Sequence, residues 1–458
     1  MEQDTESPAS QDRHAQHPRV IIAGGGLGGL ALAAGLRRHG VDVAVFERDT
    51  DLSATGGYHI HLDAAATAAL ADLLEPVMFE KLLASAATAR LQGGDVVRDM
   101  RGNLLAEVHT PGGDEGVNID RITLRLLLAE AAGDAVVLGT VVTGFARRDD
   151  GTVTVTLDNG ETHGCDLLVG AEGTHSVIAT TLAGRPTNRP TGLLGIGGST
   201  AADVLPPGVR TLLAQRSGLA VGPSGTGLYI GYHDPVGQAA VDSPRLAAPA
   251  TTTPTYIWGA VLSESGETEV LRRLAGARLR DATVAFLGHK GWSDRMLAVV
   301  TASDPGTLAA FRFSAGSPVA DELAPWPAGC VTALGDAVHA MPPTAGMGAA
   351  TAIADAAALV GQVAAVRVGR ATIPAAVHGF EQGMRRRGAA AIAASLRPVG
   401  WIHGSNTPVG AFVARVALPA VAGFAGVARV VRRRGAATRR GEARRGEARR
   451  GEKARRRG

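Results

Sequence analysis

An apolar segment that runs straight into a glycine-rich turn constrains this 458-residue chain more than any other feature. Residues 20–29 read Val-Ile-Ile-Ala-Gly-Gly-Gly-Leu-Gly-Gly, so Gly24, Gly26 and Gly29 fill a G-x-G-x-x-G pattern after a predicted buried strand. In this pattern the first glycine permits a tight turn, the second lets a pyrophosphate approach the backbone, and the third lets a helix pack closely on the strand. Residues 30–39 are predicted to form that helix, with its N–H groups and positive dipole end directed at the phosphates.

A second strand and an acidic residue complete the unit. Gly40 ends the predicted helix, and the alternating run Val-Asp-Val-Ala-Val-Phe at 41–46 predicts a strand. Glu47 follows it, at the distance from Gly24 where a carboxylate can accept hydrogen bonds from an adenosine ribose. The order strand, turn, helix, strand and acid predicts a dinucleotide-binding unit, without separating FAD from NAD(P). The predicted cofactor contacts beside these are Leu27, Gly28 and Arg48.

A second glycine-centred segment lies about 300 residues further on. Residues 331–343 read Val-Thr-Ala-Leu-Gly-Asp-Ala-Val-His-Ala-Met-Pro-Pro, a predicted buried strand that ends on Gly335-Asp336. In this order, the two segments resemble those of the FAD-dependent aromatic hydroxylases, the p-hydroxybenzoate hydroxylase-like monooxygenases. The resemblance implies that Asp336 accepts hydrogen bonds from the ribityl chain of FAD. The alternative is that Asp336 only caps a helix at an ordinary corner.

The resemblance also covers the residues that follow Asp336. It implies that Gly346 and Gly348 let the backbone approach the isoalloxazine ring, before an alanine-rich helix near 348–366. The N-terminal dipole of that helix would stabilise an anionic reduced flavin. Arg121, in the segment Asp-Arg-Ile-Thr-Leu-Arg-Leu-Leu-Leu at 120–128, is similar to a family arginine on the flavin side, the alternative being a solvated arginine at a helix start.

The middle segment departs from the family. Residues 165–176, Cys-Asp-Leu-Leu-Val-Gly-Ala-Glu-Gly-Thr-His-Ser, resemble the family's middle motif, but Glu172 replaces its aspartate and Ala179 replaces its arginine. In the family this motif helps to hold the pyrophosphate region and supports the use of nicotinamide nucleotides. The missing arginine removes a hydrogen-bond donor to a phosphate. The sequence therefore does not say how the flavin is reduced.

Composition narrows the class of protein. A hydrophobic content of 45% and a length of 458 residues are typical of a globular protein with a large core. Residues 432–458 carry a net charge of +10 whereas the whole chain carries +3, so residues 1–431 carry −7. This balance argues against a nucleic-acid-binding body and predicts a disordered basic tail. Residues 416–428 are apolar but too short to span a bilayer, which favours a packed helix over an interfacial anchor.

The cysteines, the N-terminal residues and the spacing of possible metal ligands bear on cellular location and metal binding. The two cysteines, Cys165 and Cys330, are expected to be buried thiols in a reducing compartment, and residues 1–18 are polar and carry no signal peptide. We therefore expect a cytoplasmic protein without a transmembrane segment. No His, Cys, Asp or Glu spacing predicts a metal site.

The predicted fold class is α/β: a Rossmann-like FAD-binding domain of the GR2 type with an inserted β-sheet substrate domain and C-terminal helices. Strands at 228–233 and 255–261 belong to the insertion, and alternation puts Tyr229, Gly231 and His233 on one face without saying which face is inward. Residues 282–302, which include Trp292, have helical spacing. The predicted division is 1–18 disordered; 19–75, 112–185 and 302–375 FAD-binding; 76–111 and 186–301 substrate-binding; 376–431 C-terminal helices; and 432–458 tail.

The resemblance implies a single-component monooxygenase of the compact branch, without the additional thioredoxin-like domain of larger phenol hydroxylases. NADH or NADPH would reduce a non-covalent FAD, O2 would add at the flavin C4a carbon, and the hydroperoxide would oxygenate a small aromatic or polyketide-like molecule. No side chain is predicted to be catalytic, and no oligomeric state is predicted. The altered middle motif keeps open an FAD-retaining, non-oxidative cyclase of the [4+2] type in natural-product biosynthesis. A non-enzymatic FAD-binding partner protein has no positive support in the sequence.

Overall fold

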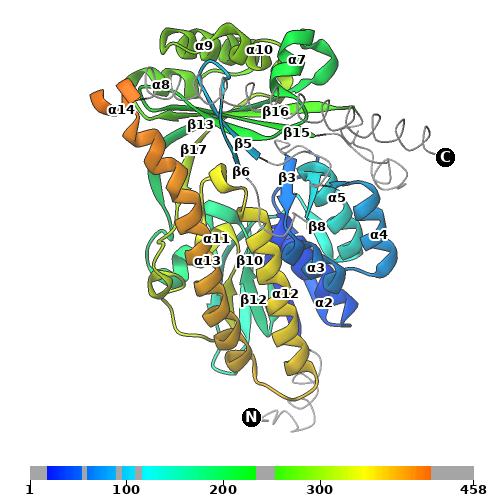
Figure 1. Cartoon of the computed structure of the whole chain (residues 1–458). Helices are drawn as coiled ribbons and strands as arrows, with labels where there is room; N and C mark the ends of the chain where they lie inside the picture. The colour runs from blue at the N-terminus through cyan, green and yellow to red at the C-terminus, as the bar shows by residue number, and fades with distance from the viewer. Residues whose placement is uncertain (1–17, 54–58, 89–94, 109–115, 234–252, 414–458) are drawn as a thin grey trace, which may run out of the picture.

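The computed structural model describes residues 18–53, 59–88, 95–108, 116–233 and 253–413. The predictions for the N-terminal 17 residues, for 416–428 and for the basic tail lie outside these ranges. Within them, helices and a parallel sheet form one part of the molecule, and a larger sheet with helices on its outer side forms the other (Figure 1).

The nucleotide-binding part is built on a five-stranded parallel sheet. Its strands, in spatial order, are β18 (Val331–Ala333), β12 (Leu167–Gly170), β1 (Arg19–Ala23), β2 (Asp42–Glu47) and β8 (Val136–Leu138). All four neighbouring pairs are parallel, so the carboxyl ends of the strands meet at one edge.

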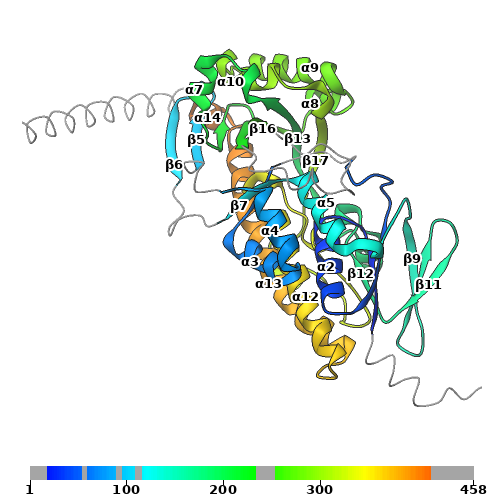
Figure 2. The ribbon, with the colours of Figure 1, turned by 90° about the vertical axis from the view of Figure 1, so that its right-hand side faces the viewer.

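Alternating side chains of these strands face two different layers. Val20 and Ile22 pack in a core with four helices, whereas Ile21 and Ala23 face a three-stranded antiparallel sheet and the short helix α6. The four helices are α2 (Leu27–Arg38), α3 (Ala64–Leu73), α5 (Arg121–Ala132) and α12 (Gly348–Arg367). The opposite layer consists of β9 (Val142–Arg147), β10 (Val153–Leu157), β11 (Thr162–Cys165) and α6 (Val177–Ala183). Figure 2 shows β9 and β11 projecting to one side of the molecule.

A second sheet of seven strands forms the other part. The strands, in spatial order, are β17 (Ala309–Ala315), β13 (Arg189–Ala201), β16 (Thr255–Ser263), β15 (Thr226–His233), β14 (Gly218–Val221), β5 (Asp95–Asp99) and β6 (Leu104–Val108). Its outer face packs against α7 (Pro207–Leu213), α8 (Gly266–Arg272), α9 (Gly276–His289) and α10 (Asp294–Thr301). Residues 282–302, predicted as one helical stretch, are therefore divided between α9 and α10. Gly291, at φ +97°, breaks the helix, and Trp292 follows it as a buried side chain between the two helices.

Some elements lie across the predicted domain boundaries. α4 (Pro76–Ala84) packs on α5, and β4 (Ala87–Thr88) pairs with β7 (Val117–Asp120), next to β3 (His59–Leu62). These residues after 75 were predicted in the substrate domain, but they lie against the nucleotide-binding part. In the other direction, β17 lies after residue 302 and pairs with β13 in the seven-stranded sheet.

The long helix α13 (Ile373–Gly404) connects the two parts. At 32 residues it is about 48 Å long. Its N-terminal half packs on α12, and its C-terminal residues Val399 and Ile402 pack on the inner face of the seven-stranded sheet, next to α14 (Pro408–Phe412). Among the described helices, α12 alone has the length and apolar composition of a membrane span, and half of its apolar window is buried, in packing against α2, α3 and α13.

The remaining described elements are short. They are α11 (Asp336–His339) and the 3-10 turns η2 (Gly133–Ala135), η3 (Gly173–His175), η4 (Ala202–Val204), η5 (Pro305–Thr307), η6 (Ala320–Glu322) and η7 (Pro343–Ala345).

Candidate functional site

The two glycine-centred segments meet at the carboxyl edge of the parallel sheet. The backbone N–H of Ala171 donates to Ala23 O at 2.7 Å, and Leu334 N–H donates to Gly170 O at 2.9 Å. A Cβ added to Gly28 would lie 2.8 Å from Leu334 Cδ1 and 3.2 Å from Ala352 Cβ. The turns after β1, β12 and β18 thus form one surface, at the edge where open α/β sheets bind their ligands.

Different physical requirements explain the glycines of the first turn. Gly24 has φ +103°, and a Cβ there would lie 2.5 Å from Ala171 O, while a Cβ at Gly29 would collide with the carbonyl of Gly24. Both are therefore needed for the packing of the protein itself. A Cβ at Gly26 would meet no protein atom nearer than Ala171 O at 4.0 Å. The first turn of α2, which Gly26 caps, contains no acidic side chain and receives no side-chain cap. Open space beside uncapped N–H groups fits a pyrophosphate.

Glu47 lies beneath this turn rather than at the surface. Its carboxylate accepts hydrogen bonds from the N–H of Gly25 and, at 2.9 Å, from the N–H of Asp49. The guanidinium of Arg125 approaches Glu47 Oε1 at 3.4 Å, donates to Gly25 O at 2.9 Å and pairs with Asp49 Oδ2 at 2.9 Å. Arg125 is 4% exposed. It ties the glycine turn to the end of β2.

Arg125 is the residue of this site that the sequence reasoning missed. It lies four residues after Arg121 on α5, so a helical spacing rule would have placed both on one face. Arg48, which was predicted as a contact, has a side chain that is 75% exposed and lies 3.7 Å from Asp49. Arg121 is half-buried and close enough to Asp336 to lower the pKa of that carboxyl.

Asp336 is accessible to solvent although protein atoms surround its carboxyl group. Its side chain is exposed, yet nearby protein atoms desolvate it and raise the pKa of the carboxyl above 3.8, against the opposing charges of His339 and Arg121. The carboxylate is thus accessible to solvent and at the same time surrounded by protein atoms. Gly348 begins α12 beside it, because a Cβ there would lie 3.9 Å from Asp336 Oδ1. Gly346, at φ +65°, has open space around its Cα.

A buried ion network supports the Asp336 turn from behind. Asp355 on α12 is fully buried and contacts His339 Nε2 at 2.5 Å and Arg387 Nη2 at 2.8 Å, and it accepts the Gly335 N–H at 3.3 Å. Gly388 lets α13 approach, since a Cβ there would lie 2.8 Å from the His339 side chain. The turn that carries Asp336 is therefore held by both long helices.

The stability of the protein should depend on the ionisation of His339. Burial opposes its charge, but the charge and hydrogen bond of Asp355, together with the charge of Asp336, raise the pKa of His339 above 6.5. Because the folded state binds this proton more tightly, its contribution is fully present below pH 6.5 and is lost as pH rises through the raised pKa. We expect urea unfolding to show this loss of stability in wild type. His339→Gln should remove that dependence, and the same change at the exposed His378 should keep it. An identical pH profile for wild type and His339→Gln would contradict the assignment.

The middle segment folds inward. Glu172 accepts from Ser176 Oγ at 2.6 Å and from Ile178 N–H at 3.0 Å, and burial raises the pKa of its carboxyl despite these bonds. Ala179 is fully buried in the core beside β12, and its N–H donates to Ser176 Oγ. An arginine could not occupy this position without leaving the core. Glu172 and Ala179 thus act together in the local packing of α6.

The structure answers which face of the seven-stranded sheet is inward. Leu228, Ile230 and Tyr232 belong to the core beneath α7 to α10. The opposite face, with Tyr229, Gly231 and His233, is directed toward the nucleotide-binding part, and α13 covers one end of it. Burial lowers the pKa of His233 to about 4, so it is neutral at pH 7. His61, on β3, contacts Asn118 Oδ1 through Nδ1 at 3.0 Å.

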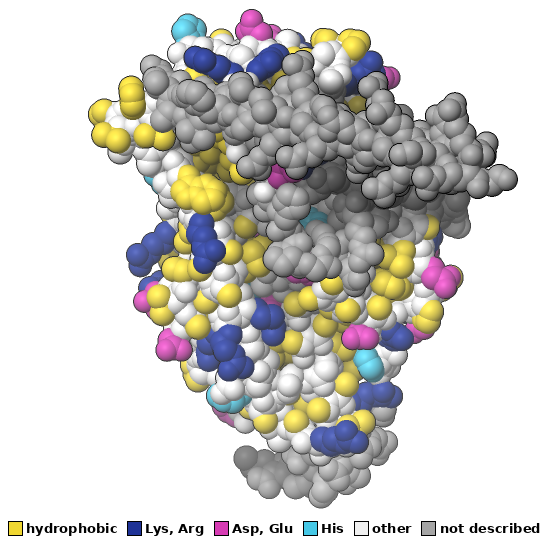
Figure 3. Space-filling view, viewed as in Figure 1, with side chains coloured by type: hydrophobic (Ala, Val, Ile, Leu, Met, Phe, Trp, Pro, Cys, Tyr) yellow, Lys and Arg dark blue, Asp and Glu magenta, His cyan; other side chains and the backbone are white. Residues whose placement is uncertain are grey.

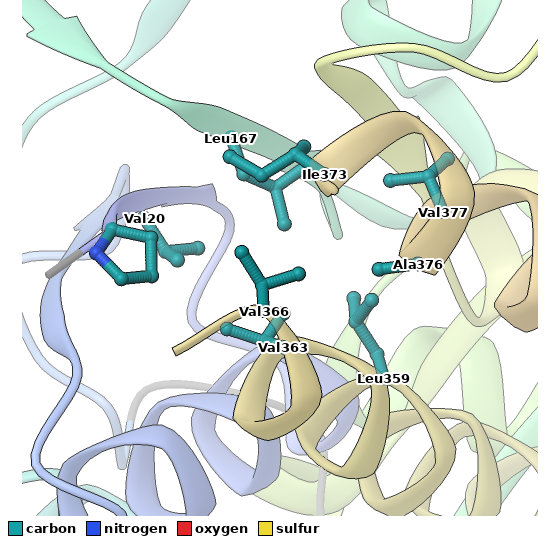
Figure 4. A pocket seen from close by; sticks show the side chains of 9 residues that line it. Val20, Leu167, Leu359, Val363, Val366, Ile373, Ala376 and Val377 are labelled. Carbon is teal, nitrogen blue, oxygen red and sulfur yellow. The ribbon is translucent and has the colours of Figure 1, made fainter. Parts of the chain in front are cut away.

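The pocket in Figure 4 lies away from these groups. It is a narrow apolar crevice with no room for a water molecule, between the starts of β1 and β12, the end of α12 and the start of α13. Its lining includes Val20, Leu167, Val366 and Ile373 and has no polar side chain. It is a packing gap at the amino edge of the sheet.

No metal site is evident in the described residues, and no large charged patch is evident on the face seen in Figure 3. No three His, Cys, Asp or Glu side chains there are arranged to hold a metal ion. On the face seen in Figure 3, basic and acidic side chains are interspersed over the coloured surface. Cys165 and Cys330 are free, and burial raises the pKa of Cys165 to about 12, so its thiol is not reactive.

Comparison with known proteins decides the family. The family model described as "FAD binding domain" matches residues 17–211 and 302–392, more than half of the chain. The chain belongs to this FAD-binding family. The unmatched residues between these two ranges contain β15, β16 and α8 to α10. The family model therefore does not cover most of the helices that pack on the outer face of the seven-stranded sheet. The predicted α/β class and the FAD cofactor are thereby confirmed.

Named relatives of this FAD-binding protein come from several organisms. A chloroplastic zeaxanthin epoxidase of Spinacia oleracea is 31% identical over 354 residues, covering 74% of this chain and 46% of the relative. A dual O-methyltransferase/FAD-dependent monooxygenase of Phaeosphaeria nodorum is 28% identical over 380 residues, covering 74% and 39%. The chain therefore spans about half the length, or less, of these curated relatives.

Solved structures share the fold. HpxO of Klebsiella pneumoniae, complexed with FAD and uric acid, has a TM-score of 0.68 at 21% identity and covers 88% of this chain and 92% of its own. The 2,6-dihydroxypyridine-3-hydroxylase of Arthrobacter nicotinovorans has a TM-score of 0.68 at 15% identity, covering 84% and 92%. At these identities the likeness establishes the fold of the FAD-binding protein, not its substrate.

Proposed function

We propose that the protein is a single-component FAD-dependent monooxygenase that acts on a small organic molecule. The observation that carries this proposal is the meeting of three features at one edge of the parallel sheet. Gly26 leaves space for a pyrophosphate, the carboxylate of Asp336 lies beside Gly348 at the start of α12, and the inner face of the seven-stranded sheet lies on the other side of that edge. A cofactor held at this edge would face a substrate held on that sheet.

The residues at this edge suit a non-covalently bound FAD. The turn formed by Gly24, Gly26, Leu27, Gly28 and Gly29 would hold the pyrophosphate, with Glu47 and the exposed Arg48 on the ribose side. Asp336 would accept from the ribityl chain with Arg121 nearby, and Gly346 and Gly348 would admit the isoalloxazine ring. We propose that Arg125 acts indirectly, because its donors are already used by Gly25, Glu47 and Asp49.

The chain's own part in the reaction is binding, orientation and exclusion of water. When bound, FAD reduced by NADH or NADPH supplies the activation of O2. The N-terminus of α12 presents the positive end of its dipole beside Asp336, where it would stabilise negative charge on the ring. His233 is neutral and buried, so it adds no charge to the substrate side. These features favour a dry site that protects a reactive oxygen donor.

The names of the relatives support oxygen transfer over the cyclase alternative. The four proteins named above include an epoxidase, a monooxygenase and a hydroxylase, and none of the four is named as a cyclase. Glu172 and Ala179, which kept the cyclase alternative open in the sequence, both serve the packing of α6. The altered middle motif therefore gives the cyclase alternative less support.

Free cysteines fit a reducing compartment, which supports a cytoplasmic location. A role in natural-product biosynthesis, such as that of an antibiotic, is part of the proposal.

The function can be tested with labelled oxygen. The protein would be supplied with NADPH or NADH, 18O2 and one of three probes: zeaxanthin, 4-hydroxybenzoate or urate. A monooxygenase should consume O2 only with a reduced nucleotide, and an accepted probe should gain one 18O atom. Conversion of a probe to an isomer, independent of nucleotide and O2, would instead establish the cyclase.

A further inference from the structure

The inner face of the seven-stranded sheet carries one continuous row of residues in register across all seven strands. Each member is the pairing partner of the next, and none is an Asp, Glu, Lys, Arg or His. The row is Ala309, Gly197, Gly259, Tyr229, Leu219, Val97 and Ala106. Six gaps between neighbouring strands, at about 4.8 Å each, make the row about 29 Å long.

The centre of this row is flat because two glycines pair there. Gly197 and Gly259 are directly opposite each other on β13 and β16, so neither strand raises a side chain above the sheet. A Cβ added to Gly259 would meet no atom within 4 Å. Tyr229, the next member, is 38% exposed and forms a wall beside the glycine pair. The result is a floor wider than a single aromatic ring.

The described residues of the two neighbouring rows on the same face are uncharged from β17 to β14. One row contains Phe311, Gly195, Val261, Gly227 and Val221 and ends at the carboxylate of Asp99 on β5, and the other contains Ser199, Ile257 and Gly231. His233, beyond the second row, is the histidine of β15 on this face and is kept neutral by burial.

The charged side chains of the sheet either point away from the floor or are hydrogen-bonded within the protein. Arg98 donates to Leu213 O in the outer core, and Arg312 pairs with Glu264 and Glu269. Asp99, the last residue of β5 on this face, is fully buried and accepts the N–H groups of its own turn, at Arg101 and Asn103. A charged ligand on this floor would lose its hydration without gaining an opposite charge from these strands.

We propose that the substrate is an uncharged, mainly apolar molecule larger than a single ring, which lies across the strands over the Gly197–Gly259 pair. This inference rests on the proposed function, because it takes the inner face of the sheet as the substrate side of the FAD site. The driving force is the burial of apolar surface against a face that offers few hydrogen-bond partners.

The test compares two matched glycine variants of the FAD-loaded protein. Gly259→Leu places a side chain over the floor, and Gly144→Leu places the same side chain in open space on β9, in the three-stranded sheet on the other side of the nucleotide-binding part. Zeaxanthin, progesterone, 4-hydroxybenzoate and urate are titrated in the same detergent buffer without nicotinamide nucleotide. Binding is followed by the change in the flavin absorption spectrum, and folding by urea unfolding.

We expect saturable binding of at least one of the two uncharged apolar probes and weaker binding of the other two. Gly259→Leu should weaken the apolar binding at least about tenfold, which corresponds to about 1.4 kcal/mol. Gly144→Leu should leave it unchanged. Failure of both apolar probes to bind would overturn the inference, as would tighter binding of 4-hydroxybenzoate or urate, or unchanged binding by folded Gly259→Leu.

The same experiment separates this inference from the proposed function. Binding is measured without a reductant, so apolar binding that Gly259→Leu abolishes supports the substrate class even where no oxygen transfer follows. Nucleotide-dependent oxygenation of 4-hydroxybenzoate, with no apolar binding, would keep the monooxygenase and reject the substrate class.

Discussion

Gly26→Val should fold normally and purify without FAD. The backbone at Gly26 is extended, at φ −76° and ψ −179°, which valine adopts readily, and the nearest protein atom to the new Cβ is Ala171 O at 4.0 Å. The added methyl groups would occupy the space through which the pyrophosphate approaches the first turn of α2. We expect the affinity for FAD to fall by a factor on the order of a hundred or more, or about 2.8 kcal/mol. The ratio of released flavin to protein and a titration of apoprotein with FAD measure this loss.

Two other glycines serve as controls for this result. Gly144→Val adds the same side chain to open space on β9 and should retain FAD. Gly24→Val should fail to fold, because Gly24 has φ +103° and the carbonyl of Ala171 lies 2.5 Å from the new Cβ. A soluble Gly26→Val protein with a full complement of FAD would show that the cofactor does not pass this turn.

Arg125→Ala should strongly destabilise the folded protein. It would leave the buried carboxylate of Glu47 without its cation and the carbonyls of Gly25 and Leu52 without a donor. Removing one partner of a buried ion pair costs about 3–5 kcal/mol of unfolding free energy. We expect a loss in that range by urea denaturation, together with weaker FAD binding. The glycine turn would no longer be tied to the end of β2.

Two further arginine variants separate charge from geometry. Arg125→Lys keeps the charge, but it lacks the planar fork that reaches Gly25, Asp49 and Glu47 together, so it should recover only part of the loss. Arg48→Ala removes a side chain that is 75% exposed and should change stability by less than about 0.5 kcal/mol. Equal stability of Arg125→Ala and Arg48→Ala would contradict the role of Arg125 in tying the glycine turn to β2.

The difference between Arg48 and Arg125 shows where sequence reasoning reaches its limit. The order of strand, glycine turn, helix, strand and acid is local, so it predicted β1, α2, β2 and the position of Glu47. Which arginine reaches the turn depends on how α5 docks on the sheet from 100 residues away in the chain. Adjacency to Glu47 favoured Arg48, whereas tertiary packing selected Arg125.

The sheet and the middle segment illustrate the same limit. Alternation along 228–233 assigned Tyr229 and His233 to one face, but only the docking of α7 to α10 on the other face made theirs the inner one. The replacement of an expected arginine by Ala179 suggested a missing phosphate donor. In the structure, position 179 is part of the core, and Glu172 bonds to Ser176. Comparison of a residue with the family's motif does not by itself predict such a change in local packing.

Anaerobic reduction of the bound flavin distinguishes a monooxygenase from a protein in which FAD serves only as scaffold. FAD-loaded protein would be mixed with NADH or NADPH without oxygen, alone and with each probe that binds, and dithionite would establish that the flavin is reducible. A monooxygenase predicts that a nicotinamide nucleotide bleaches the yellow flavin absorption, faster when a bound probe is present, and that admitted O2 restores it. Bleaching by dithionite alone, with neither nucleotide reducing the flavin in the presence of a bound probe, would contradict the monooxygenase and indicate a flavin that serves only as scaffold.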